Sequence, residues 1–209
     1  VSSLEALLVS SFRMFFKNIN LDATIYVNNR KLLDSLLDYC NIQKDKQESA
    51  IISIDKIKKI GIDAVEAELN QKNIKKESIK KLFSFFCSNE TDNSKILGSL
   101  SNVLKNNEGI TEMRELLDYC NNFNIKNIIL DISLARGLAY YTGTVFEAFL
   151  NSNEISSSLA AGGRYNNMIA NFMDSKEETP AVGISFGLDV LADAIKLSKK
   201  TQFKQSVAS

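Results

Sequence analysis

The sequence predicts an α+β protein in which an antiparallel sheet is flanked by helices. Residues 4–16 carry apolar side chains at helical spacing, and residues 43–123 repeat Leu, Ile and Phe every three or four positions. Six of the nine glycines, together with the only proline, fall between residues 137 and 187, where short apolar runs are separated by turns. Helices and strands are therefore segregated along the chain, which differs from the alternation that parallel βαβ units require.

The N-terminal part predicts a helix, a strand and a second helix. The first helix covers residues 4–16, and residues 23–27 form a short run typical of a strand. Asn28 or Asn29 can cap the following helix at residues 31–39, because asparagine accepts hydrogen bonds from the free N–H groups of a first helical turn.

The middle of the chain predicts a block of helices with an apolar stripe of its own. Residues 44–82 hold ten lysines and seven acidic residues. A solvated helical face explains this balance, and a patch that touches phosphate groups is the alternative.

The C-terminal part predicts strands joined by turns and loops. Residues 128–134 (IILDISL) indicate a strand interrupted by Asp131, residues 144–150 (TVFEAFL) a second strand, and residues 181–187 (AVGISFG) a third, followed by a helix at 189–196. The last strand also fits the G-x-S-x-G pattern of serine hydrolases. That pattern needs a base, and the chain has no histidine.

The composition excludes several classes of site. Without histidine, neither a Ser-His-Asp or Cys-His nucleophile nor a zinc site with imidazole ligands can form, and we expect no metal site of the protein's own. Lysine plus arginine equals aspartate plus glutamate, so the net charge favours no partner. The apolar runs are too short to cross a bilayer, and the N-terminus lacks a secretory signal. The three cysteines predict buried free thiols in a reducing compartment.

Three groups of residues could carry chemistry. Arg136 follows a predicted strand, where its guanidinium can bind carboxylate or phosphate through two parallel hydrogen bonds or simply pair with a surface acid. Tyr140 and Tyr141 would point to opposite faces of an extended chain, so one could pack inward and the other reach a site. Paired glycines at 162–163, before Arg164 and Tyr165, allow a close backbone approach or a tight turn.

In this order, the motifs resemble those of histidyl-tRNA synthetases, which are class II aminoacyl-tRNA synthetases. The segment from Arg136 to Glu147 (RGLAYYTGTVFE) is similar to the family's first histidine signature, residues 160–165 (AAGGRY) to the second, and residues 181–188 (AVGISFGL) to the strand of motif 3. The resemblance implies a first part of the catalytic core at residues 1–41, a helical insertion domain at 42–123, and the second part of the core at 124–209.

The resemblance also implies an activity and its residues. The family activates L-histidine with ATP, which brings Mg²⁺, and transfers it to tRNA(His) in the cytoplasm as a homodimer. Arg136 is implied as the catalytic residue that bridges the histidine carboxylate and the α-phosphate. The histidine-binding residues implied with it are Tyr140, Tyr141, Tyr165, Gly162 and Gly163. Gly183 and Gly187 are implied to bind ATP with Arg136.

The sequence departs from the family at three positions. Ala139 and Asn166 stand where acidic residues are usual, and Val190 occupies the place of the motif 3 arginine. Motifs 1 and 2 are expected before Val1 and an anticodon-binding domain after Ser209, so we expect a fragment or a divergent paralogue. The alternative function is an inactive synthetase-like regulatory module that binds histidine or tRNA.

Overall fold

The computed structural model describes residues 2–88, 90–137, 140–152, 154–175 and 177–206. Its strands are β1 (Ala23–Asn29), β2 (Ile128–Leu130), β3 (Thr144–Leu150), β4 (Ala160–Arg164) and β5 (Val182–Phe186). Its helices are α1 (Ser2–Asn18), α2 (Arg30–Tyr39), α3 (Lys44–Ile54), α4 (Ile57–Ile60), α5 (Ile62–Gln71), α6 (Lys76–Phe86), α7 (Asn93–Val103), α8 (Glu108–Asn122), α9 (Asn166–Phe172) and α10 (Leu188–Ser206).

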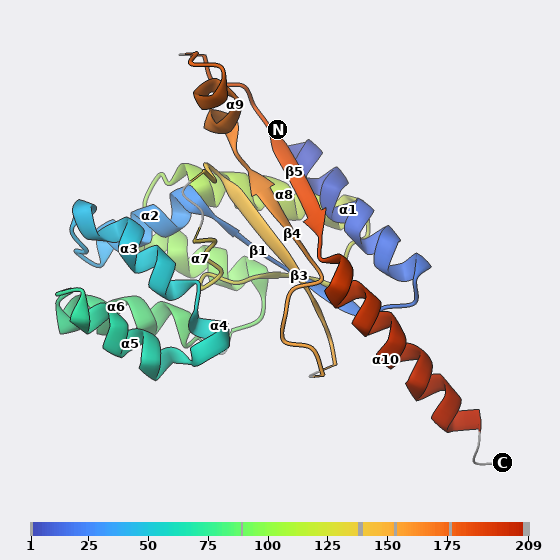
Figure 1. Cartoon of the computed structure of the whole chain (residues 1–209). Coiled ribbons are helices and arrows are strands. Elements are labelled where there is room, and N and C mark those ends of the chain that lie inside the picture. The colour runs from blue at the N-terminus through green and yellow to red at the C-terminus, as the bar shows by residue number, and fades with distance from the viewer. Residues whose placement is uncertain (1, 89, 138–139, 153, 176, 207–209) are drawn as a thin grey trace.

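The strands form one sheet in the order β2-β1-β3-β4-β5 (Figure 1). The pairs β1–β3, β3–β4 and β4–β5 are antiparallel, whereas β1 and β2 are parallel. The predicted α+β class with a sheet flanked by helices is confirmed, and the parallel pair makes the sheet mixed. Parallel neighbours need a long crossover, and the helices α2 to α8 lie in the connection between β1 and β2.

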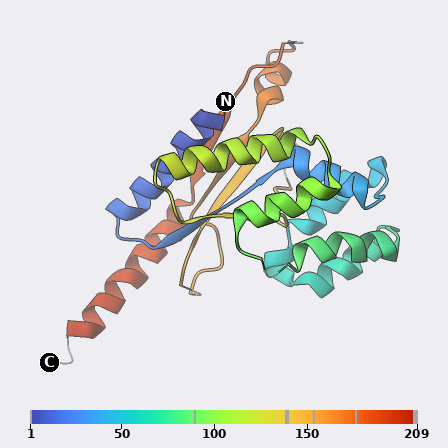
Figure 2. The same cartoon turned by 180° about the vertical axis from the view of Figure 1, so that it is seen from behind.

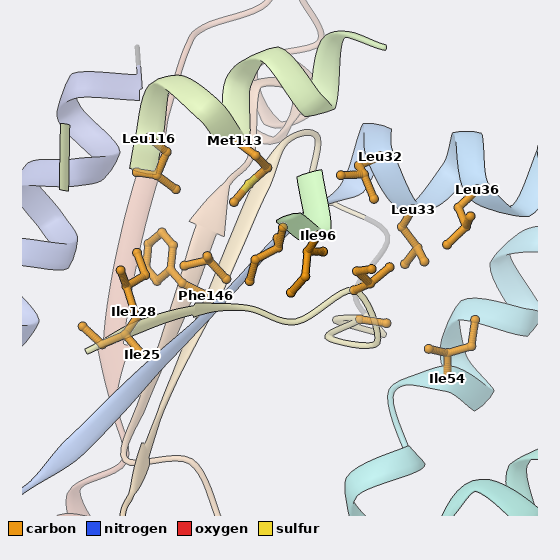
Figure 3. Close-up of a cluster of buried hydrophobic side chains, with 14 of the residues drawn as sticks. Ile25, Leu32, Leu33, Leu36, Ile54, Ile96, Met113, Leu116, Ile128 and Phe146 are labelled. Carbon is orange, nitrogen blue, oxygen red and sulfur yellow. The ribbon is translucent and has the colours of Figure 1, made fainter. Parts of the chain in front are cut away.

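Helices α1 and α8 cover one face of the sheet, which Figure 2 shows from behind. Phe12 of α1 meets the ring of Phe146 edge-on, with 5.6 Å between ring centroids. Met113 and Leu116 of α8 lie over the same strand in Figure 3. All four side chains are buried, so this face carries the main hydrophobic core. In Figure 1 the opposite face is turned to the viewer, and none of the labelled helices crosses β3 and β4 there.

The turn from β1 into α2 confirms the predicted helix cap. The side chain of Asn29 accepts a hydrogen bond from the backbone N–H of Lys31 at 2.9 Å. Its amide nitrogen donates to Glu112 of α8 at 2.6 Å. Asn29 therefore starts α2 and also ties it to the helix that covers the core.

Two expectations about the chain's elements were wrong. The strand predicted at 128–134 ends at Leu130, because the Asp131 carboxylate accepts hydrogen bonds from the backbone N–H and hydroxyl of Ser133 and closes a local turn. Such a turn competes with a strand ladder. Cys87, expected to be buried, is exposed after the end of α6. Cys40 and Cys120 are buried free thiols, as predicted.

The helices α3 to α8 fall within residues 42–123, as the sequence predicts. The last of them, α8, lies beside α1 on the sheet in Figure 2. Whether the block is a domain of its own stays a prediction. Among the described residues, no helix has the length and apolarity needed to cross a membrane.

Candidate functional site

The face of the sheet opposite α1 and α8 carries a second, smaller group of apolar and aromatic side chains. Leu134, Tyr141 and Val145 are buried together there. Because side chains alternate across a strand, Val145 and Glu147 of β3 point to this face, while Phe146 points into the core. The partly buried rings that join the group are those of Tyr26, Tyr140 and Tyr165.

The segment that carries Arg136 is held by β1. The buried side-chain amide of Asn28 donates hydrogen bonds to the backbone carbonyls of Ile132 and Leu134, both at 2.9 Å. A buried amide with two such bonds fixes the backbone that accepts them. Arg136 leaves this anchored segment on the side of the sheet where Glu147 points, and its guanidinium forms an ion pair with the Glu147 carboxylate.

Arg136 retains an unused hydrogen-bond donor. Its side chain is 25% exposed, and its Nε is buried without a hydrogen-bond partner in the part of the chain that the structure describes. Burial acts to lower the pKa of Arg136, but the negative charges around it, Glu147 first, raise the pKa overall. Burial raises the pKa of Glu147 against the influence of Arg136. The guanidinium is therefore a fixed cation, and its buried Nε makes no hydrogen bond to the described residues.

The three predicted tyrosines lie together. The ring centroids of Tyr140 and Tyr141 are 4.5 Å apart, and Tyr165 meets Tyr140 edge-on at 6.3 Å. The expectation that Tyr140 and Tyr141 point to opposite faces was wrong, because the chain turns at Tyr140. Burial, followed by the neighbouring Tyr140, raises the pKa of Tyr141 to about 12, although Arg136 opposes that rise. Arg136 and the phenol of Tyr141 thus influence each other directly.

Two glycines give these rings their space. A Cβ at Gly163 would lie 2.8 Å from the ring of Tyr141, and a Cβ at Gly183 would lie 2.3 Å from the hydroxyl of Tyr165. Any side chain at either position would displace a tyrosine. Gly162 faces the core instead, where a Cβ would lie 2.1 Å from the carbonyl of Gly183. A Cβ at Gly187 would make only ordinary contacts, so no steric reason requires a glycine there.

A cavity of 170 Å³ adjoins Arg136. The Arg136 and Glu147 side chains line it from the sheet side, Asp55 lines it from the turn between α3 and α4, and Lys58 and Lys59 line it from α4. The tyrosines do not line this cavity. Arg136 therefore stands between the group of phenols and a hollow that the helical block helps to enclose.

Arg164 has a structural place on the other face of the sheet. Its Nη2 lies 2.8 Å from the Oε1 of Glu5 in α1, and both side chains are almost fully buried. The two Arg-plus-Tyr pairs in the sequence therefore differ, because Arg136 lies on the side of the phenols whereas Arg164 holds α1 to β4.

A family model described as histidyl-tRNA synthetase matches residues 8–191 of the chain. The chain belongs to the histidyl-tRNA synthetase family. The histidine–tRNA ligase 1 of Bacillus cereus strain ZK is 39% identical over 192 residues, which cover 91% of the chain and 45% of the relative. The histidine–tRNA ligase of Clostridium tetani is 36% identical over 184 residues, which cover 85% of the chain and 41% of the relative. The chain thus spans less than half the length of these relatives, and it belongs to a ligase family.

Solved structures agree with this family. The crystal structure of histidyl-tRNA synthetase from Nostoc sp. PCC 7120 superposes with a TM-score of 0.85 at 30% identity, covering 95% of the chain and 48% of that protein. A Bacillus halodurans protein described as an ATP phosphoribosyltransferase regulatory subunit/histidyl-tRNA synthetase reaches a TM-score of 0.77 at 16% identity, over 93% of the chain and 50% of that protein. At that identity the likeness extends to the fold alone.

Two of the three departures from the histidyl-tRNA synthetase pattern lie in the described part of the chain, and Ala139 lies outside it. The Asn166 side-chain oxygen accepts a hydrogen bond from the backbone N–H of Ala181 at 3.3 Å. The backbone N–H of Asn166 donates to the Thr142 hydroxyl at 3.1 Å. The side-chain oxygen of Asn166, which an aspartate would also offer, therefore bonds the residue just before β5, whereas the bond to the first signature comes from the Asn166 backbone. Val190 packs against the main core beside Gly187 and brings no charge there.

The structure also brings two residues to the site that the sequence alone did not single out. The sequence pattern could have indicated Glu147, since it is an acid in an otherwise apolar strand and shares a face with Val145. No sequence pattern indicated Asp55, because it lies at the end of α3 among many other charged residues. The histidine- and ATP-binding roles implied for Arg136, the tyrosines and the glycines stay predictions.

Proposed function

We propose that the natural polypeptide containing this chain activates L-histidine with ATP and transfers the histidyl group to tRNA(His). The family membership of the chain supports a ligase of this kind. The observation that carries the proposal is Arg136, whose guanidinium lies beside the phenol of Tyr141 and keeps a buried Nε free of partners in the described structure. The tyrosines and this cation together suit a ligand with an imidazole and a carboxylate.

In the proposed reaction, a carboxylate oxygen of histidine attacks the α-phosphorus of ATP and pyrophosphate leaves. Negative charge accumulates on the phosphoryl oxygens as the new bond forms, so a cation fixed in advance lowers the barrier. Arg136 can supply one donor to the carboxylate and another to the phosphate, because a guanidinium presents several N–H groups in a rigid fork. A hydroxyl of the terminal ribose of tRNA(His) then attacks the histidyl carbonyl carbon, and AMP leaves.

Glu147 has a part in this scheme before substrate arrives. It neutralises Arg136 in the ligand-free protein, so a substrate carboxylate or phosphate must share or replace that pairing. The phenols of Tyr140, Tyr141 and Tyr165 can hydrogen-bond the imidazole nitrogens. Polar contacts of this kind discriminate strongly, because an analogue without the nitrogens leaves buried hydroxyls unpaired.

The remaining partners follow from the same proposal. Mg²⁺ would arrive with ATP and screen its phosphates. Among the described residues, no three carboxylate or thiol groups gather to hold a metal of their own. Gly183 and Gly187 are the ATP contacts that the resemblance implies. A cytoplasmic homodimer, as the family resemblance implies, completes the proposal.

One observation favours a second candidate, a regulatory module that binds histidine or tRNA without activating the amino acid. Val190 packs against the core where the family's motif 3 has an arginine, so one expected cation on the nucleotide is missing. Loss of a charged transition-state contact typically lowers the rate by two to three orders of magnitude. The retained Arg136 and tyrosines favour the ligase.

The test is histidine-dependent ATP–pyrophosphate exchange by the natural polypeptide. We expect exchange in the wild type and a loss on the order of 10²–10³-fold in Arg136→Ala. The control is Arg114→Ala, which removes an exposed arginine of α8 whose guanidinium donates to the Ser101 hydroxyl. Exchange that survives Arg136→Ala unchanged rejects the role of Arg136. Histidine binding without any exchange in the wild type establishes the regulatory function instead.

A further inference from the structure

Residues 55–60, which form the turn after α3 and the short helix α4, contact the segment that carries Arg136 at both of its ends. The Asp55 carboxylate accepts a hydrogen bond from the backbone N–H of Gly137, and the position of a Gly137 Cβ lies 3.3 Å from its Oδ2. At the other end, the ammonium of Lys58 lies 2.8 Å from the Oδ2 of Asp131. The two contacts bracket residues 131–137, which lead from β2 to the predicted catalytic arginine.

Helix α4 is also fixed to the sheet. The Lys58 ammonium lies 3.9 Å from the centre of the Tyr26 ring in β1 and 4.7 Å from that of Phe149 in β3. A cation over aromatic faces is attracted by their negative charge. Lys58 thus contacts two strands and the Arg136 segment at once, so α4 and the turn that precedes it have a defined place over the sheet.

Asp55 is the second carboxylate around Arg136. It lines the 170 Å³ cavity together with Arg136 and Glu147. Burial raises the pKa of Asp55, and the charge of Arg136 opposes that rise. The guanidinium therefore interacts with one carboxylate from the strand that forms the site and with one from a distant helical segment.

We propose that Asp55 is a positioning residue for Arg136, through which the docked turn between α3 and α4 sets the orientation of the guanidinium. The carboxylate holds the Gly137 N–H and attracts the guanidinium, while Lys58 holds the start of the segment through Asp131. When the turn is docked, Arg136 faces the phenols. When the turn is displaced, Arg136 keeps only Glu147 and loses its fixed direction. The functional part of this inference rests on the proposed ligase activity.

Two substitutions separate positioning from a structural contact. Asp55→Asn keeps an oxygen that can accept from Gly137 but removes the charge, whereas Asp55→Ala removes both. The matched control is Asp45→Asn, in the first turn of the preceding helix α3, at an exposed position without an ion pair among the described residues. All three variants are compared with the wild type by thermal unfolding, which excludes a global loss of fold as the cause of any effect.

The first readout is the kinetics of histidine-dependent ATP–pyrophosphate exchange by the natural polypeptide. If Asp55 orients Arg136 for the transition state, Asp55→Asn and Asp55→Ala both lower kcat on the order of 10-fold or more and change the KM for histidine by less than about 3-fold. Asp45→Asn matches the wild type. If the two Asp55 variants change only the KM for histidine, or change neither kcat nor KM, the positioning role is overturned.

The second readout needs no catalysis. Hydrogen exchange of the backbone amides in residues 131–137 is expected to rise at least about 10-fold in Asp55→Ala, with a smaller change in Asp55→Asn and none in Asp45→Asn. If the wild-type polypeptide shows no ATP–pyrophosphate exchange, the proposed ligase function fails. Hydrogen exchange still decides whether the turn between α3 and α4 holds residues 131–137. Unchanged amide exchange in Asp55→Ala refutes the inference itself.

Discussion

Replacing Glu5 by alanine removes the buried partner of Arg164 and tests what holds α1 to the sheet. The two side chains are 1% and 6% exposed, and Nη2 lies 2.8 Å from Oε1. In Glu5→Ala the guanidinium stays buried beneath α1 without its counter-charge. Breaking a buried ion pair by removing one partner costs about 3–5 kcal/mol, which is a large part of the roughly 5–15 kcal/mol that stabilises a typical domain.

Urea unfolding, followed by circular dichroism, measures this loss. The control is Glu48→Ala, an exposed acid of α3, which should change the free energy of unfolding by less than about 0.5 kcal/mol. The double variant Glu5→Leu with Arg164→Met should be more stable than Glu5→Ala, because it leaves no unpaired charge. A loss below about 1 kcal/mol in Glu5→Ala would refute the buried pair as a determinant of the fold.

The same pair predicts a dependence on pH. Burial raises the pKa of Glu5 above its usual 4.5, against the opposing effect of Arg164. The folded protein therefore binds this proton more tightly than the unfolded chain. Stability relative to Glu5→Gln is highest below about pH 4.5 and falls as the pH rises through the folded-state pKa. Free energies of unfolding of the wild type and of Glu5→Gln from pH 4 to pH 8 measure this dependence. If the stability of the wild type relative to Glu5→Gln rises with pH, the result contradicts the effect of burial on Glu5.

Two further predictions concern the site and the thiols. Gly163→Ala places a Cβ 2.5 Å from the Thr144 carbonyl and 2.8 Å from the Tyr141 ring, so it should cost about 1–3 kcal/mol and change the near-ultraviolet circular dichroism of the tyrosines. An unchanged spectrum and stability would mean that no ring lies over this glycine. Among the thiols, Cys87 should react with a thiol reagent in the native protein, while Cys40 and Cys120 should not. Both are buried, and burial raises their pKa values to about 11 and 12. Reaction of all three at one rate would contradict this.

Sequence pattern predicted the elements that depend on local chemistry. The β3 strand follows from its apolar run, and the start of α2 follows from the capping amide of Asn29. The strand β4 was not predicted, because the glycine pair at 162–163 also suited a tight turn; in the structure Gly163 lies under a tyrosine while Arg164 turns to the core side. The sequence marked Asp131 as an interruption of the strand at 128–134, but it did not show that the hydrogen bonds of this carboxylate end β2 at Leu130.

The site was predictable only in part. Arg136 and the tyrosines lie close together in the sequence and share a motif, so their grouping was visible before the structure. The contact between Asp55 and Gly137 joins segments that are remote in the chain. No local pattern marks Asp55, because its significance depends on how the helical block folds back onto the sheet.

The most direct test of the central claim is a crystal structure of the natural polypeptide with a non-hydrolysable analogue of histidyl-adenylate. We expect the Arg136 guanidinium to lie within hydrogen-bond distance of the phosphoryl group or its neighbouring carbonyl oxygen. We also expect the imidazole to lie among Tyr140, Tyr141 and Tyr165. An analogue bound elsewhere, with Arg136 still closed on Glu147 and the phenols empty, would contradict it.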